Sequence, residues 1–371
     1  MKKLIIGFLF TLFPIFAAER IVKDGYELVV NPSKIENGNF EVEMKQLYRI
    51  DADTKVLDFT VADISYGHSV EFDADENIYF IENSLKKILK FNREGDFVAC
   101  YGNEGKGPGE YDFLNSFTID KNGLFYIPNH TGMKMMQYGK DFKFIKDIEF
   151  NNSQLPSSLV NFGDYFIGSS LLFTFTDGKS EKGYDIALYD DTFTKLKTFK
   201  EDKKEVDLSK PMDMTGDIIR FSVDNLNNKV YIARNDISTY FIDVYDESGN
   251  KIQEIERKYR KIYYTDEERE DLNNRYKVII NGEKLKVDAK YKPSIEKILV
   301  DKNGYLWVDP AEDKGLDEKN LYDIYKNGEL IAQIDLDNLL PEKFTFFSYD
   351  NGKILGTDEE KNLLVFEIFI K

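Results

Sequence analysis

One pattern recurs along this chain and restricts its fold more than any other feature. An apolar strand leads to a turn of Asp, Asn and Gly, then to a second strand rich in Tyr, Ile and Phe, and after a polar gap to a third strand. Alternating β-branched and aromatic residues favour pleated strands, and Asn and Gly tolerate the positive φ angles of tight hairpins. Clear copies span 70–98 and 117–145, and looser copies span 165–189, 221–245, 298–325 and 344–370.

Six copies of this unit predict an all-β chain folded as a six-bladed β-propeller. A sheet of three or four strands cannot bury both of its faces alone, whereas radial stacking against similar sheets buries both. The copies are unevenly spaced. This spacing predicts one polar insertion near 201–217 and a second insertion over 263–293.

The second insertion is expected to contain a short helix over 266–280. Thr265 and Glu268 have the spacing of a capping box, and Leu272, Tyr276 and Ile280 follow at the spacing of one helix face. We expect this helix to lie on one face of the propeller. It would serve either as a structural cover or as a lid or docking arm for a partner.

The amino terminus has the layout of a removable signal peptide, residues 1–18. Two lysines precede an apolar run over 4–16, and two small alanines follow before the first charged residues. The run is too short to span a bilayer comfortably, although an uncleaved anchor is the alternative. We therefore expect a bacterial protein exported to the periplasm or the extracellular space, with no membrane span in the mature chain.

The remaining chain divides into an extension over 19–39 and the propeller over 40–371. The last copy lacks an outer strand, and an open ring would leave unpaired strand edges. Two strand-like stretches, 40–43 and 46–50, precede the first clear copy. We expect this N-terminal region to pair into the C-terminal blade and close the ring.

Composition excludes several classes of protein. The net charge of −17 and the excess of acids argue against a nucleic-acid partner, which requires a basic face. A single cysteine excludes an internal disulfide and a cysteine-based zinc cluster. That cysteine, Cys100, lies in an apolar stretch and is expected to be buried.

Residues 101–111 carry a family resemblance. Their Gly-x-Gly-Pro-Gly-x-aromatic linker leads to Asp120, to Asn122-Gly123 and to an aromatic strand over 124–127. This arrangement resembles the linker and core of the NHL repeat, and the chain is similar to exported bacterial six-bladed propellers of that superfamily. Residues 291–308 resemble a late blade of the same group. The resemblance implies the fold; because the superfamily includes both binding scaffolds and enzymes, it leaves the function open.

No catalytic residue can be assigned from the sequence. The glycine cluster near Gly105 lacks the spacing of a phosphate-binding loop, and Pro108 removes a backbone donor. The Asp-rich turns do not fit a calcium-binding loop and are interpreted as Asx turns. The two histidines, His68 and His130, are too few for a three-histidine zinc site and are expected at different levels of the propeller. We predict no cofactor and no metal.

The mouth of the central channel is the predicted site, because loops from every blade meet at a ring axis. The residues expected there, just ahead of innermost strands, are His68, Asn115, Arg220 and Ser294. The leading hypothesis is a monomeric exported binding or scaffold protein for a protein, peptide or glycan partner, without catalysis. One alternative is a lactonase-like hydrolase or lyase that uses a divalent metal at the channel mouth. Another is a structural component of a cell-surface complex.

Overall fold

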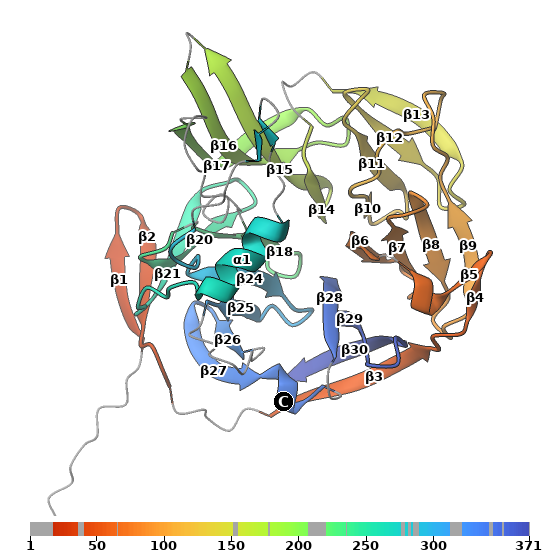
Figure 1. Cartoon of the computed structure of the whole chain (residues 1–371). Coiled ribbons are helices and arrows are strands. Elements are labelled where there is room, and N and C mark those ends of the chain that lie inside the picture. The colour runs from red at the N-terminus through yellow and green to blue at the C-terminus, as the bar shows by residue number, and fades with distance from the viewer. Residues whose placement is uncertain are drawn as a thin grey trace, which may run out of the picture.

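Six sheets are arranged radially around a central axis (Figure 1), and they form the predicted six-bladed β-propeller. The computed structural model describes residues 18–35, 41–64, 66–150, 155–176, 179–206, 220–234, 236–275, 279–280, 283–284, 289–311, 321–340, 344–350 and 352–370. The predicted signal peptide lies outside these residues except for Ala18.

Each blade is an antiparallel sheet, and the innermost strand comes first in every blade. Blade 1 contains β6 (Tyr66–Phe72), β7 (Ile78–Glu82), β8 (Lys87–Phe91) and β9 (Phe97–Tyr101). Blade 2 contains β10 (Thr118–Ile119), β11 (Phe125–Asn129), β12 (Lys134–Tyr138) and β13 (Phe144–Glu149). Blade 3 contains β14 (Ser158–Phe162), β15 (Tyr165–Thr176), β16 (Lys179–Tyr189) and β17 (Lys195–Val206).

The second half of the ring repeats this order. Blade 4 contains β18 (Arg220–Asp224), β19 (Lys229–Ala233), β20 (Tyr240–Asp246) and β21 (Lys251–Arg257). Blade 5 contains β24 (Ile295–Val300), β25 (Leu306–Pro310), β26 (Leu321–Lys326) and β27 (Glu329–Asp335). Blade 6 contains β28 (Thr345–Asp350), β29 (Lys353–Thr357), β30 (Leu363–Ile370) and, from the N-terminal region, β3 (Val42–Ile50).

In blades 1, 2, 4 and 5 the turn between the first two strands is an Asx turn, as predicted for Asp73, Asp120, Asp224 and Asp301. In blade 5 the Asp301 carboxylate accepts the backbone N–H groups of Asn303 and Tyr305, both at 2.9 Å. Its second oxygen accepts the indole N–H of Trp307 at 3.1 Å. Equivalent bonds join Asp73 to Tyr79 and Asp120 to Tyr126. The turn aspartate therefore also anchors the aromatic side chain of the second strand.

The glycine-rich linker is a tight connection between blades 1 and 2, as predicted. Gly102 has a φ of +100°, and a Cβ placed there would lie 1.6 Å from the hydroxyl oxygen of Tyr111. Tyr111 is fully buried, and its hydroxyl donates to the carbonyl of Lys86 at 3.0 Å. The linker path therefore requires glycine at this position.

The prediction that an N-terminal strand closes the ring is confirmed. β3 pairs antiparallel with β30 from Val42↔Ile370 to Ile50↔Leu363, and becomes the outer strand of blade 6. The two expected stretches form one strand, whose register shifts between Gln46 and Tyr48. Ring closure joins the first part of the propeller to the last.

The extension before β3 forms two further strands that the sequence did not indicate. β1 (Glu19–Lys23) and β2 (Tyr26–Asn31) make a hairpin, and β2 pairs in parallel with β21 at the outer edge of blade 4. Asn31 is buried and reaches the neighbouring blade. It donates to the Gly328 carbonyl at 2.9 Å and accepts the Leu330 N–H at 2.8 Å. The hairpin therefore links blades 4 and 5.

Of the two predicted insertions, the first falls partly on a strand of blade 3, and the second is present with a shorter helix than predicted. The stretch 201–206 belongs to β17, because β16 pairs with it as far as Ser180↔Val206; residues 207–217 of the predicted insertion lie outside the described residues.

In the second insertion, α1 (Asp266–Arg275) ends earlier than predicted. Ile279 and Ile280 form β22 (Ile279–Ile280), which pairs with β23 (Glu283–Lys284) around an Asn-Gly sequence. Two β-branched residues before Asn-Gly favour a hairpin over a helix.

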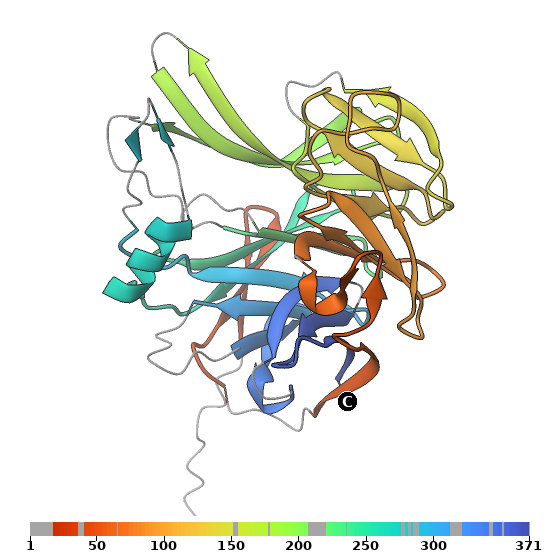
Figure 2. The ribbon, with the colours of Figure 1, turned by 45° about the vertical axis from the view of Figure 1, so that its right-hand side comes forward.

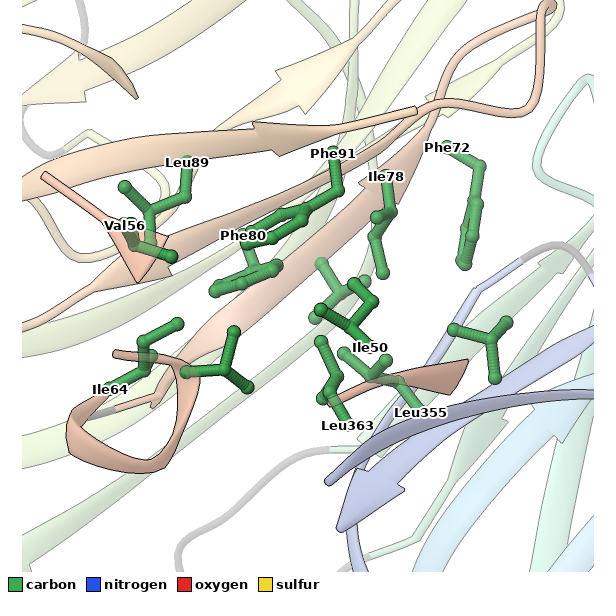
Figure 3. Close-up of a cluster of buried hydrophobic side chains, with 13 residues drawn as sticks. Ile50, Val56, Ile64, Phe72, Ile78, Phe80, Leu89, Phe91, Leu355 and Leu363 are labelled. Carbon is green, nitrogen blue, oxygen red and sulfur yellow. The ribbon is translucent and has the colours of Figure 1, made fainter. Parts of the chain in front are cut away.

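The hydrophobic core lies between adjacent blades. Figure 3 shows one cluster, in which Ile50, Leu355 and Leu363 of blade 6 face side chains of blade 1 such as Ile78 and Phe80. These five residues are at most 1% exposed. Cys100 is half-buried at the edge of this cluster, so the expectation of a buried residue holds only in part.

Candidate functional site

The two faces of the propeller differ in the length of their loops. Neighbouring strands of a blade are antiparallel. The turn between the second and third strands therefore lies at the same end of the blade as the connectors that enter and leave it. We call that end the insertion face; it includes 83–86, 110–117, 130–133, 236–239, 259–275 and 289–294. Figure 2 shows α1 and the long β15–β16 hairpin projecting on one side. The opposite face, here the turn face, carries the short Asx turns.

Three large apolar side chains are exposed on neighbouring loops of the insertion face of blades 1 and 2. Leu85 is 42% exposed, Phe113 55% and Met133 39%. The connector that carries Phe113 lies between the other two turns, because Lys86 Nζ donates to the Asp112 carbonyl at 3.1 Å and Asn129 Nδ2 donates to the Glu110 carbonyl at 3.5 Å. We call Leu85, Phe113 and Met133 the apolar trio.

The helical insertion rises from a two-stranded stem on blades 4 and 5. The Tyr264 N–H donates to the Lys290 carbonyl at 3.1 Å, and the Lys292 N–H donates to the Ile262 carbonyl at 2.9 Å. The stem is fixed to blade 4, since the Ser294 N–H donates to the Asp236 carbonyl at 2.9 Å. The base of the insertion is therefore part of the propeller framework.

The start of α1 has the predicted capping box. The Thr265 N–H donates to Glu268 Oε2 at 2.8 Å, and the Glu268 N–H donates to Thr265 Oγ1 at 3.2 Å. The Glu268 carboxylate also pairs with the buried Lys292 of the stem. Burial opposes the charge of Glu268, but Lys292 and Thr265 together lower its pKa below the ordinary value. Leu272 anchors the helix against Ala289 and Tyr264.

Two tyrosines and two lysines form an exposed cluster on this stem. The rings of Tyr263 and Tyr291 have centroids 4.6 Å apart and planes tilted by 42°, and their hydroxyls are hydrogen-bonded at 3.4 Å. Lys261 Nζ lies 5.1 Å from the centroid of the Tyr291 ring, and Lys290 Nζ lies 5.4 Å from the same centroid. The bond to Tyr263 and the charges of Lys290 and Lys261 lower the pKa of Tyr291. We call these four residues the Tyr–Lys cluster.

The four predicted channel-mouth residues come from four blades and have different surroundings. His68 lies within β6 and not ahead of it, and Asn115 is half-buried in the connector before β10. Arg220 begins β18 and donates through Nε to the Glu296 carbonyl of blade 5. Ser294 is fully buried directly before β24. A binding role for these residues stays a prediction.

The two histidines lie toward the same end of neighbouring blades, so the expectation that they sit at different levels is wrong. His68 is on the innermost strand β6, whereas His130 follows the second strand β11. The cause is the antiparallel pairing, which brings the end of a second strand level with the start of an innermost strand. Burial lowers the pKa of His130.

Within the described part of the chain, no group of three or more His, Cys, Asp or Glu side chains is placed to hold a metal ion. A buried charged network lies inside blade 4, where Arg234 and Lys251 both pair with Asp243 and Glu254. Because the two acids are at most 3% exposed, this network serves the fold.

Sequence reasoning missed both the apolar trio and the Tyr–Lys cluster. The cluster had a visible signal, the run Arg-Lys-Tyr-Arg-Lys-Ile-Tyr-Tyr at 257–264, which is basic and aromatic in an acidic chain. The trio had none, because its members are far apart in sequence and lie on three separate loops.

Comparison with solved structures supports the fold. An exported-protein candidate from Bacteroides fragilis NCTC 9343 aligns with a TM-score of 0.53 at 13% identity, over 93% of this chain and 99% of that one. A DUF4221 protein from Bacteroides vulgatus ATCC 8482 aligns with a TM-score of 0.51 at 12% identity, over 89% and 99%. A gluconolactonase from Xanthomonas campestris aligns at only 0.44 and 10% identity, over 88% and 90%, too weakly to bear on activity.

No relative was found among curated protein sequences. In the described residues, no helix is long and apolar enough to cross a membrane. The profile of a six-bladed β-propeller family, DUF5128, matches residues 59–262, which is more than half of the chain. This chain therefore belongs to the DUF5128 family of six-bladed β-propellers.

Proposed function

We propose that this propeller is an exported binding or scaffold protein that holds a protein, peptide or glycan partner on its insertion face and performs no catalysis. The observation that carries the proposal is the shared exposure of the apolar trio. Large exposed apolar surfaces commonly mark partner sites, and these three side chains come from neighbouring loops of one face. The insertion face also carries α1 and the extended β15–β16 hairpin, which enlarge the area available to a partner.

Location and oligomeric state form part of the same proposal. The signal-like N-terminus supports a periplasmic or extracellular location, and we expect a monomer whose docking face is free for a partner. The resemblance of the 101–111 linker to NHL repeats supports kinship with that superfamily of propellers. Cell fractionation and sedimentation test the first two points directly.

A paired substitution tests which face binds. Phe113→Asp places a charge in the apolar trio, whereas Leu226→Asp makes the same change at a 66% exposed leucine in a turn of the opposite face. Purified wild-type and variant chains would be immobilised and exposed to the native exported fraction. We expect the Phe113 variant to lose the captured partner and the Leu226 variant to keep it.

Two results would contradict this proposal. One is capture that survives Phe113→Asp and is lost with Leu226→Asp. The other is a melting shift on addition of Ca²⁺, Mn²⁺ or Zn²⁺ accompanied by lactone hydrolysis, which would favour the metal-dependent enzyme. Equal melting temperatures of the two variants serve as the control for folding.

A further inference from the structure

The stem of the helical insertion is a basic island on an acidic protein. Segments 257–264 and 289–292 contain six Lys or Arg residues and no Asp or Glu, whereas the whole chain carries −17. Two of these cations are neutralised internally: Arg257 pairs with Asp323 at 2.7 Å, and Lys292 pairs with Glu268. The exposed cations are Lys258, Arg260, Lys261 and Lys290.

Acidic neighbours limit this positive region to the stem itself. Asp236 of blade 4 is close enough to Lys261 for the lysine charge to contribute to its lowered pKa. The first turn of α1 carries Asp266, Glu267 and Glu268. A long polyanion lying across the face would therefore meet repulsion beyond the stem, whereas a ligand of a few units would fit within it.

The Tyr–Lys cluster combines an aromatic surface with lysine ammonium groups that lie over its rings. Tyr263 is 59% exposed. The planes of the Tyr263 and Tyr291 rings are tilted by 42° to each other. Lys290 Nζ lies within 6 Å of both ring centroids, at 5.9 Å and 5.4 Å. Aromatic rings present an apolar body with a polar hydroxyl at the tip, and lysine ammonium groups pair with carboxylates.

We propose that the Tyr–Lys cluster is a binding site for an acidic oligosaccharide, such as a chain of uronic acids. The apolar C–H face of a sugar ring packs on a tyrosine ring, its hydroxyls bond to the tyrosine hydroxyls, and its carboxylate pairs with Lys261 or Lys290. Sugar rings match a tilted aromatic pair better than a flexible acidic peptide does. This inference rests on the proposed binding function and names the ligand class for one part of the insertion face.

The test measures binding of the full mature chain to a galacturonic-acid hexamer by calorimetry. Three other probes are compared: the methyl-esterified hexamer, a poly-Glu peptide and a single-stranded DNA oligomer. The variants are Tyr263→Ala/Tyr291→Ala and Lys261→Gln/Lys290→Gln. The matched control is Tyr165→Ala/Lys143→Gln, which changes an exposed tyrosine and an exposed lysine on the turn face.

We expect the acid hexamer to bind, with affinity that falls as salt rises. Each cluster variant and the methyl ester should bind at least about tenfold more weakly, the control should match wild type, and all melting temperatures should agree. The inference would be overturned by any of four results: the methyl ester binds as tightly as the acid hexamer, poly-Glu or DNA binds more tightly, the cluster variants bind as the wild type does, or the hexamer does not bind. If the hexamer fails while partner capture still depends on Phe113, the proposed function stands without this inference.

Discussion

The substitution Asn31→Ala tests whether the N-terminal hairpin stabilises the ring. Asn31 is 1% exposed and bonds to the backbone of Gly328 and Leu330 in the adjacent blade. Alanine would leave a buried N–H and a buried carbonyl without this partner. Each orphaned buried group costs about 1–3 kcal/mol, so the two together should cost roughly 2–6 kcal/mol. With an unfolding entropy of about 2.1 cal/mol/K per residue, the melting temperature should fall by about 3–8 °C.

The assay is thermal unfolding followed by the fluorescence of Trp307, the sole tryptophan, which is buried in blade 5, the blade that Asn31 contacts. Arg20→Ala removes exposed ion pairs of the same hairpin to Glu27 at 2.8 Å and Glu329 at 2.9 Å, and should cost less than about 1 kcal/mol. Asn250→Ala repeats the asparagine substitution in an exposed turn. If Asn31→Ala shifts the transition no more than these two controls, the hairpin is not coupled to the ring.

Three further predictions concern the helix cap and pH. Thr265→Ala should weaken α1 by about 1 kcal/mol, seen as faster hydrogen exchange over 266–275 with an unchanged global melting temperature. Burial opposes the charge of Asp243, but its hydrogen bonds to Arg234 and Lys251 lower its pKa below the ordinary value. The stability that the charged carboxylate contributes is therefore present above pH about 4 and is lost as the pH falls below that. In acid titrations, the stability of Asp243→Asn should decline less steeply than that of the wild type. Burial raises the pKa of Tyr126 to about 12. The free energy of folding that the neutral phenol contributes is therefore lost as the pH rises from about 10 through 12. Ultraviolet titration should show ionisation of Tyr126 together with unfolding.

The blades could be predicted because their information is local. Each unit carries alternating apolar residues and an Asp at the first hairpin, and the structure uses both: Asp301, for example, holds the turn and also Trp307. Ring closure by β3 was predictable for a different reason, since a ring with a missing outer strand leaves one open edge.

The β1–β2 hairpin and the end of α1 could not be predicted in the same way. β2 pairs in parallel with β21, a strand more than 200 positions away, and no local pattern encodes such a partner. For α1, the apolar spacing that continues to Ile280 matched a helix, but Ile279-Ile280 before Asn-Gly formed a hairpin instead. Helical periodicity was thus overridden by turn chemistry at the end of the insertion.

The position of the helical insertion follows from how blades 4 and 5 are held together. On their outer edges Asn31 joins β2 of blade 4 to β27 of blade 5, and on their inner edges Arg220 reaches the carbonyl of Glu296. The stem is tied to this pair of blades by the bond between Ser294 and Asp236. Because the supporting blades are clamped at both edges, Tyr263 and its neighbours are held in place before a ligand arrives. A pre-ordered site loses less conformational entropy on binding, so this support should strengthen the binding proposed for the Tyr–Lys cluster.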